Sequence, residues 1–241
     1  SFLDKPARTV LVMTLPVLGT AIAEPLTSLA DTCFLARLGS TPLAALGIAT
    51  SILSGAFWVL GFIGVGIQTL AAGAQGEGDK DLLQRRVGTA LVMAGLLSLL
   101  MVVLLPFLGV ISEAMGATGE LRETAVEYMR IRLFGAPAVL VGFAAFGALR
   151  GVQDMRTPLY ISIGINALNI ILDPLMIFGY GPFPEMGVAG AAWASVISQW
   201  LGLAWAVTAL RKKVGFHLCL HRPTLKYLLA TGRDMFIRTG S

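Results

Sequence analysis

Long apolar segments recur along the chain and constrain the fold more than any other feature of the sequence. Each is long enough for the roughly 20 residues that a helix needs to cross the hydrocarbon core of a bilayer, and the six lie at residues 9–36, 44–74, 84–111, 124–150, 158–179 and 187–210. Hydrophobic residues make up 56% of the 241 positions and charged residues only 13%, outside the range of soluble domains. No segment shows the alternation typical of an outer-membrane barrel. The sequence therefore predicts an all-α, polytopic membrane protein with a six-helix transmembrane bundle.

Basic residues alternate between the loops of this bundle. Lys80, Arg85 and Arg86 follow the second segment, the loop after the fourth is also basic, and a basic run from Arg211 follows the sixth. Because basic loops are retained on the cytoplasmic side, both ends of the six-helix unit are predicted to be cytoplasmic. The formal net charge of +4 is thus explained by basic loops on the cytoplasmic side of the cytoplasmic membrane. No nucleic-acid partner is expected.

The first segment carries two carboxylates where a bilayer tolerates them least. Glu24 and Asp31 are seven residues apart, close to two helical turns, so they share one face of a helix. An ionised carboxylate inside a span costs at least about 2.5 kcal/mol and must face a cavity or a partner. Pro16 and Pro25 each remove a backbone hydrogen bond and predict a helix that can bend.

A second polar stripe runs along the fifth segment. Ser162, Asn166, Asn169 and Asp173 follow one another at intervals of four, three and four, so they share one helix face. Asp31 and Asp173 are each expected about 9 Å below the outer end of their helices. If these helices are neighbours, the two stripes line one cavity in the outer half of the membrane. The two carboxyl groups then hold a proton near neutral pH as a coupled unit.

The fourth and sixth segments add further polar candidates. Arg130 and Arg132 either snorkel to the outer interface or balance the acids, and both interpretations remain open. Gln199 is a possible polar contributor on the sixth segment, where small residues predict close helix packing. These small residues are Gly187, Ala191, Ser195, Ser198 and Gly202, and the tryptophans expected at lipid or at the interface are Trp193, Trp200 and Trp205.

Two motifs point weakly to other chemistry. Residues 76–79 match the Gly-x-Gly-Asp pattern of intramembrane aspartyl proteases, but Asp79 lies among charges in a polar loop. Such catalysis needs its acid inside a helix and facing a second acid. His217, Cys219 and His221 alternate in a basic loop, which is weak support for a metal site. We therefore expect neither an enzyme nor a metal centre.

Several stretches together resemble the multidrug and toxic compound extrusion (MATE) transporters, and more narrowly their DinF-like branch. They are LADTCFLARLG, LRGVQDMRTPL, LNIILDPLMIFGYG and GVAGAAWASVISQ. The resemblance implies two six-helix lobes. Residues 1–212 would be the N-terminal lobe, 213–226 the cytoplasmic inter-lobe linker and 227–241 the start of a seventh helix that is cut off, with the C-terminal lobe as the missing partner.

The resemblance also implies a function. Such proteins use a cation gradient to export organic, often cationic, toxic compounds or drugs, with H+ or Na+ as coupling ion and no cofactor. The matching coupling positions are Asp31, Asp173 and Asn169, and Pro16 matches the bend residue. The expected substrate cavity adds Tyr128, which matches a polar aromatic position in the fourth helix, and Asn166, Glu24 and Gln199.

The mechanism expected from these residues is a competition for charge. Protonation neutralises Asp31 and Asp173, the first helix bends near Pro16 or Pro25, and a cationic substrate leaves outward. Three alternatives remain: a sodium-coupled exporter, a lipid flippase of the same superfamily, and a half-bundle that serves as an interaction partner without transport. A flippase favours basic residues for phosphate, whereas the interior stripes are expected to carry acids and amides.

Overall fold

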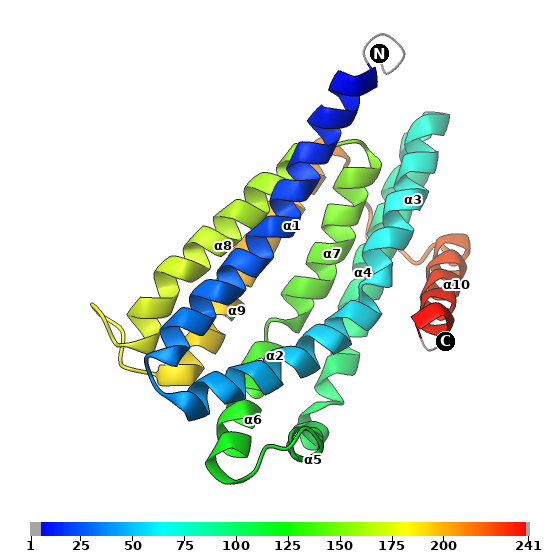
Figure 1. The fold of residues 1–241 in the computed structure, drawn as a ribbon. Coiled ribbons are helices and arrows are strands. Elements are labelled where there is room, and N and C mark those ends of the chain that lie inside the picture. Colours follow the sequence, from blue (N-terminus) through cyan, green and yellow to red (C-terminus); the bar gives the residue numbers. More distant parts are fainter. Residues whose placement is uncertain (1–5, 240–241) are drawn as a thin grey trace.

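Helices joined by short loops make up the structure, a computed structural model that describes residues 6–239, apart from several side chains in the first helix and at the end of the last. The described residues contain no strand, so the all-α prediction is confirmed. In chain order the elements are α1 (Pro6–Ala36), α2 (Ser40–Leu60), α3 (Phe62–Glu77), α4 (Lys80–Val102), the 3-10 helix η1 (Leu105–Phe107), α5 (Leu108–Ala114), α6 (Gly119–Leu133), α7 (Ala136–Gly151), α8 (Arg156–Ile177), α9 (Gly187–Lys213) and α10 (Arg222–Thr239) (Figure 1).

Four helical stretches among the described residues are long and apolar enough to cross a membrane: Ser40–Glu77, Lys80–Ala114, Arg156–Ile177 and Gly187–Lys213. The pair α6 and α7 meets the same test as one span that is bent by 50°. These five match the second to sixth predicted segments. The first predicted segment is α1, a helix of 31 residues that runs through the positions of both Pro16 and Pro25.

Two of the spans are broken where the sequence weakens the helix. Gly61 separates α2 from α3, and glycine disfavours a helix interior. Phe134 and Gly135 separate α6 from α7, and Pro137 follows in the first turn of α7, where its missing N–H costs no helical hydrogen bond. The second break matters for the site, because it sets the direction of α6.

Helix α7 lies at the centre of the bundle, against α3, α4 and α9. Its close approach to α3 depends on Gly147, since a Cβ there would lie 2.2 Å from the carbonyl oxygen of Gly64. Helix α8 packs between α1 and α9. On α9, Ala191, Ser195 and Gly202 are buried, so the predicted close-packing face is confirmed for them.

The basic turns lie together at one end of the bundle. The α3–α4 and α7–α8 turns are at the top of Figure 1, and the α1–α2 and α8–α9 loops are at the opposite end. Asp31 and Asp173 lie within the last two turns of α1 and α8, so both belong to the end away from the basic turns. Their equal depth, predicted from spacing alone, follows from this arrangement.

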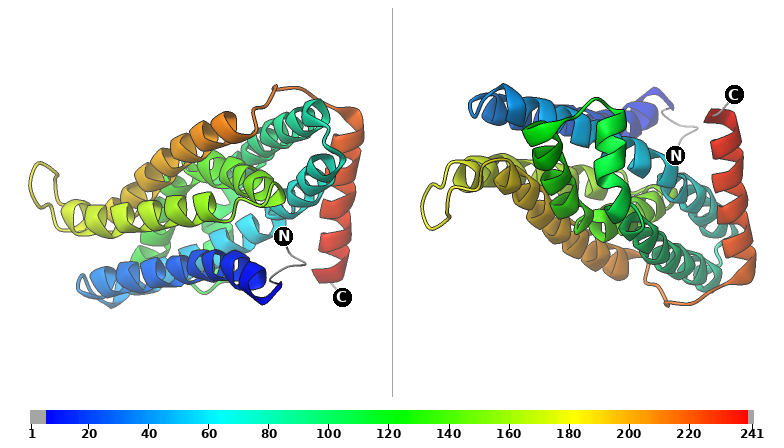
Figure 2. Two further views of the ribbon diagram at one scale, coloured as in Figure 1. Left: turned by 90° about the horizontal axis from the view of Figure 1, so that it is seen from above. Right: turned by 90° about the horizontal axis from the view of Figure 1, so that it is seen from below.

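Helix α10 packs against α3 and α4 and crosses them steeply (Figure 2). Helix α9 ends at Lys213 and α10 begins at Arg222, so the segment expected as a linker at 213–226 consists of the last residue of α9, a loop at 214–221 and the start of α10. The predicted start of a seventh helix at 227 therefore falls inside α10.

Candidate functional site

The carboxyl groups of Asp31 and Asp173 meet where α1 packs against α8. The two side chains lie within hydrogen-bonding reach of each other. Asp173 is fully buried. One oxygen of each group, Asp31 Oδ1 and Asp173 Oδ2, is buried and receives no hydrogen bond from a protein donor in the described part of the chain. The sequence placed these acids at one depth, and the structure brings them into one site.

Asn169 joins the acid pair to α9. Its amide Nδ2 donates to Asp173 Oδ1 at 3.4 Å and to Ser195 Oγ at 3.4 Å, and all three side chains are buried. Asn169 lies one turn before Asp173 on α8, as the spacing predicted. Ser195 is an addition to the site, because the sequence analysis placed it only on a packing face.

Helix α6 contributes a tyrosine and an arginine. Tyr128 is buried, and Arg132 follows it one turn later on the same face of α6, within electrostatic range of its hydroxyl. Arg132 Nη1 donates to Gln199 Oε1 at 2.9 Å. The guanidinium lies within electrostatic range of both Asp31 and Asp173. Of the two interpretations left open for this arginine, the structure therefore supports the one in which it balances the acids.

Arg132 adds a basic group to the polar interior. The polar stripes of the first and fifth segments were expected to carry acids and amides, and the guanidinium reaches the acid pair from α6, which carries neither stripe. The available signal was spacing: Arg132 follows Tyr128 by four residues and so shares its helix face. Arg130 is exposed and lies on another face of α6.

The break between α6 and α7 holds Arg132 in place. Trp200 Nε1 donates to the Phe134 carbonyl oxygen at 3.0 Å, and the Phe134 ring stacks on Trp193 with centroids 6.0 Å apart. Gly135 leaves room for the Gln199 side chain, since a Cβ there would lie 2.6 Å from Gln199 Oε1. Trp193 and Trp200 thus fasten the broken span to α9, in addition to the lipid or interface contacts that were expected.

The remaining candidates lie around this centre or outside the described side chains. Asn166 is half-buried and lies two turns before Asp173 on the same face of α8. Pro25 is exposed on α1. The side chains of Pro16 and Glu24 lie outside the described residues, so their expected roles remain predictions.

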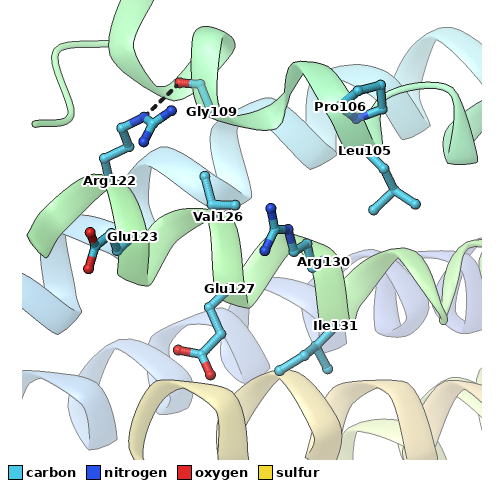
Figure 3. Close-up of a pocket in the computed structure, with 9 residues that line it drawn as sticks. All are labelled: Leu105, Pro106, Gly109, Arg122, Glu123, Val126, Glu127, Arg130 and Ile131. Carbon is cyan, nitrogen blue, oxygen red and sulfur yellow. Dashed lines mark hydrogen bonds between the residues drawn. The ribbon is translucent and has the colours of Figure 1, made fainter. Parts of the chain in front are cut away.

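A separate hollow of about 480 Å³ lies on the opposite side of α6, between that helix and the η1–α5 segment (Figure 3). Arg122, Glu123, Glu127 and Arg130 line it. Arg122 Nε forms an ion pair with Glu113 Oε1 at 2.8 Å. Helix α6 borders both this hollow and the site around the acid pair, but no residue that lines the hollow belongs to that site.

The two motifs that pointed to other chemistry have local structural explanations. Asp79 precedes α4 and accepts a hydrogen bond from the Leu82 backbone N–H at 2.9 Å, so it caps a helix at the polar end of the bundle. Thr89 Oγ1 donates to the Cys219 carbonyl oxygen at 3.0 Å and accepts from the His221 backbone N–H at 3.0 Å. These backbone contacts hold the loop before α10 against α4.

Comparisons with known proteins place this arrangement in a family. The family model that matches is described as MatE and covers residues 16–175, well over half of the chain. Protein DETOXIFICATION 44, chloroplastic, of Arabidopsis thaliana is 32% identical over 213 residues, 83% of this chain and 40% of that protein. The probable multidrug resistance protein NorM of Thermotoga maritima is 30% identical over 212 residues, 86% of this chain and 45% of that protein.

The match to DNA damage-inducible protein F of Escherichia coli supports the DinF-like branch: it is 28% identical over 248 residues, 99% of this chain and 53% of that protein. The chain thus spans about half the length of the relatives it matches.

Solved structures agree with the fold. A crystal structure of MATE in the bent conformation has a TM-score of 0.85 and 27% identity, over 95% of this chain and 52% of that one. A MOP superfamily transporter from Pyrococcus furiosus has a TM-score of 0.84 and 27% identity, over 93% of this chain and 50% of that one. Half of a MATE fold is consistent with these matches, and the chain belongs to the MatE family, whose members are transporters and not enzymes.

Proposed function

We propose that the protein is a proton-coupled antiporter that exports organic, often cationic, toxic compounds across the cytoplasmic membrane, and that this chain carries its proton-titrating site. The observation that carries the proposal is the contact between the Asp31 and Asp173 side chains at the α1–α8 interface. The names of the relatives, several of which refer to multidrug resistance or detoxification, support the substrate class.

The contact between the two carboxyl groups implies that the site binds a proton. Two carboxyl groups within hydrogen-bonding reach in a dry site repel each other when both are ionised, so the pair holds one proton and titrates as a unit. Asp31 Oδ1 and Asp173 Oδ2 are buried without a donor among the described residues, and a bound proton supplies the donor that such a pair requires.

Antiport follows because the proton and the substrate compete for the acid pair. A cationic substrate binds the pair in its anionic form, and a proton arriving from outside displaces it by neutralising the site. Because the proton and the substrate compete for the same negative charge, each favours a different access state, and the proton gradient drives export. Asn169, which bonds to both Asp173 and Ser195, transmits the change in charge from α8 to α9.

The test removes one titrating group at a time. Asp31→Asn and Asp173→Asn in the full-length protein should each abolish the drug resistance of expressing cells and substrate-driven proton movement in vesicles. Asp81→Asn is the matched control, because Asp81 lies at the basic end of the bundle in an exposed ion pair with Arg85. If both site variants retain normal efflux at normal expression, the assignment is rejected.

The coupling ion needs a separate measurement. Carboxylate and amide oxygens such as those of Asp173 and Asn169 also suit Na+, so sodium remains the alternative ion. Transport driven by a pH gradient in sodium-free vesicles is the result expected for proton coupling. Transport that requires a sodium gradient and ignores the pH gradient would replace H+ by Na+ in the proposal.

A further inference from the structure

Arg132 places a fixed positive charge beside the acid pair. Its Nη1 donates to Gln199 Oε1 at 2.9 Å. Gln199 lies one helical turn after Ser195 on α9, and Ser195 accepts from Asn169, which also donates to Asp173. The arginine is therefore about one helical turn from the hydrogen-bond network of the acids.

Two contacts restrain Arg132, one at its side chain and one at the backbone beside it. Its guanidinium donates to Gln199 on α9, and the backbone just beyond it is fastened by the hydrogen bond from Trp200 to the Phe134 carbonyl. An arginine held at its guanidinium and at the adjacent backbone loses the freedom to reach the membrane interface. Its charge is thus a constant part of the site.

The formal charge of the site can be counted from every helix around it. Helix α1 supplies Asp31 and α8 supplies Asp173. Helix α6 supplies the neutral Tyr128 and the positive Arg132, and α9 supplies only neutral groups. The sequence of α2 contains no ionisable side chain, and that of α7 only Arg150, in its last turn. Among the described side chains that face the site, the sum is therefore minus one when both acids are ionised.

We propose that Arg132 limits the site to one added positive charge, so that a single proton or a single monovalent cation neutralises it. We call this number of added charges the capacity of the site. This proposal rests on the antiport function proposed above and adds its stoichiometry and substrate class. A second proton or a second cationic group would leave a net positive charge in a low-dielectric site, which is costly. The preferred substrates are therefore organic monocations, and dications are disfavoured.

Two different substitutions should raise the capacity to two. Arg132→Gln removes the positive charge, and Gln199→Glu adds a negative charge that pairs with Arg132 in place. Either change leaves the site at minus two, so binding of a dication relative to a monocation should rise by at least about tenfold, given one extra unit charge at close range. The protons moved per monocation should rise from about one towards two.

The control variants distinguish an effect of the charge of Arg132 from an effect of misfolding. Arg132→Lys keeps the positive charge, so its preference for monocations and its number of protons per monocation should stay closer to wild type than those of Arg132→Gln, even where transport is slower. Arg130→Gln removes an arginine two residues away that lines the hollow on the opposite side of α6, and it should also behave as wild type. Because Gln199→Glu is nearly isosteric, it tests the proposal even where Arg132→Gln does not fold.

The experiment uses full-length protein in sodium-free vesicles. The pH gradient that halts flux of a monovalent quaternary ammonium dye gives the proton number, and the same protein in detergent gives its affinity for that dye and for its bis-quaternary analogue. Unchanged selectivity and proton number in both Arg132→Gln and Gln199→Glu would overturn the proposal. If wild type shows no proton-driven flux, the antiport function fails, and the detergent affinities alone decide the role of Arg132.

Discussion

Asp154, in the turn between α7 and α8, shows how single side chains fix the end of the bundle away from the acid pair. Burial alone would raise the pKa of this carboxyl group, but hydrogen bonds from Lys213 and Thr157 outweigh it, so the pKa lies below its ordinary value of 3.8. The Thr157 backbone N–H donates to Asp154 Oδ1 at 3.0 Å and Lys213 Nζ donates to Thr157 Oγ1 at 2.8 Å. One carboxylate thereby links the start of α8 to the end of α9.

This link predicts a pH-dependent loss of stability. A carboxylate whose pKa is lowered by folding stabilises the protein above its unfolded pKa, and that contribution disappears as the pH falls through the folded value. Asp154→Asn should therefore lower the free energy of unfolding by about 1 kcal/mol at pH 7. The difference in melting temperature between wild type and variant should shrink from about pH 5 to pH 3. A difference that stays constant over this range would contradict the linkage.

At the level of elements, the broken span α6–α7 gives the site its fourth helix, after α1, α8 and α9. The 50° bend turns α6 so that Tyr128 and Arg132 face α1, α8 and α9, while α7 continues between α3 and α9. A bend frees backbone carbonyls, and the Phe134 carbonyl finds its partner in the Trp200 indole. The geometry of the site is thus tied to a contact that lies outside it.

Trp200→Phe should therefore disturb the site without touching the acids. The loss of the bond to the Phe134 carbonyl is expected to cost about 1 kcal/mol of stability and to weaken transport, because Arg132 is no longer held at its backbone. Trp205→Phe is the control, since Trp205 is a half-exposed tryptophan on the same helix. Thermal unfolding in detergent and vesicle flux measure the two effects. Equal stability and equal flux in both variants would show that the break between α6 and α7 does not depend on the Trp200 indole.

The contact between α3 and α7 predicts a packing limit. Gly147→Ala should destabilise the fold by about 1–3 kcal/mol, because the new Cβ would lie 2.2 Å from the Gly64 carbonyl oxygen. Gly142→Ala, on the same helix, meets nothing within 4 Å and should have little effect. The yield of monodisperse protein after heating compares the two variants. A normal yield for Gly147→Ala would mean that the two helices separate at little cost.

For the whole molecule, the basic turns at one end and the acid pair near the other define a direction across the membrane. We expect the basic end to face the cytoplasm. In a background with Cys33→Ser and Cys219→Ser, Glu120→Cys should react with an impermeant maleimide added to intact cells. Lys80→Cys should react only after the membrane is permeabilised. The reverse pattern would invert the orientation and with it the proposed direction of export.

The sequence by itself determined the helical class, the extent of the spans and the two acids at equal depth, because hydrophobic length and helical spacing are local properties. It also pointed to Asn169, Tyr128 and Gln199 as members of the site. Spacing left the role of Arg132 open and gave no reason to single out Ser195. Those assignments depend on which helices are neighbours and on how far α6 turns at Phe134 and Gly135. Such contacts join residues far apart in the chain, so only the tertiary structure decided them.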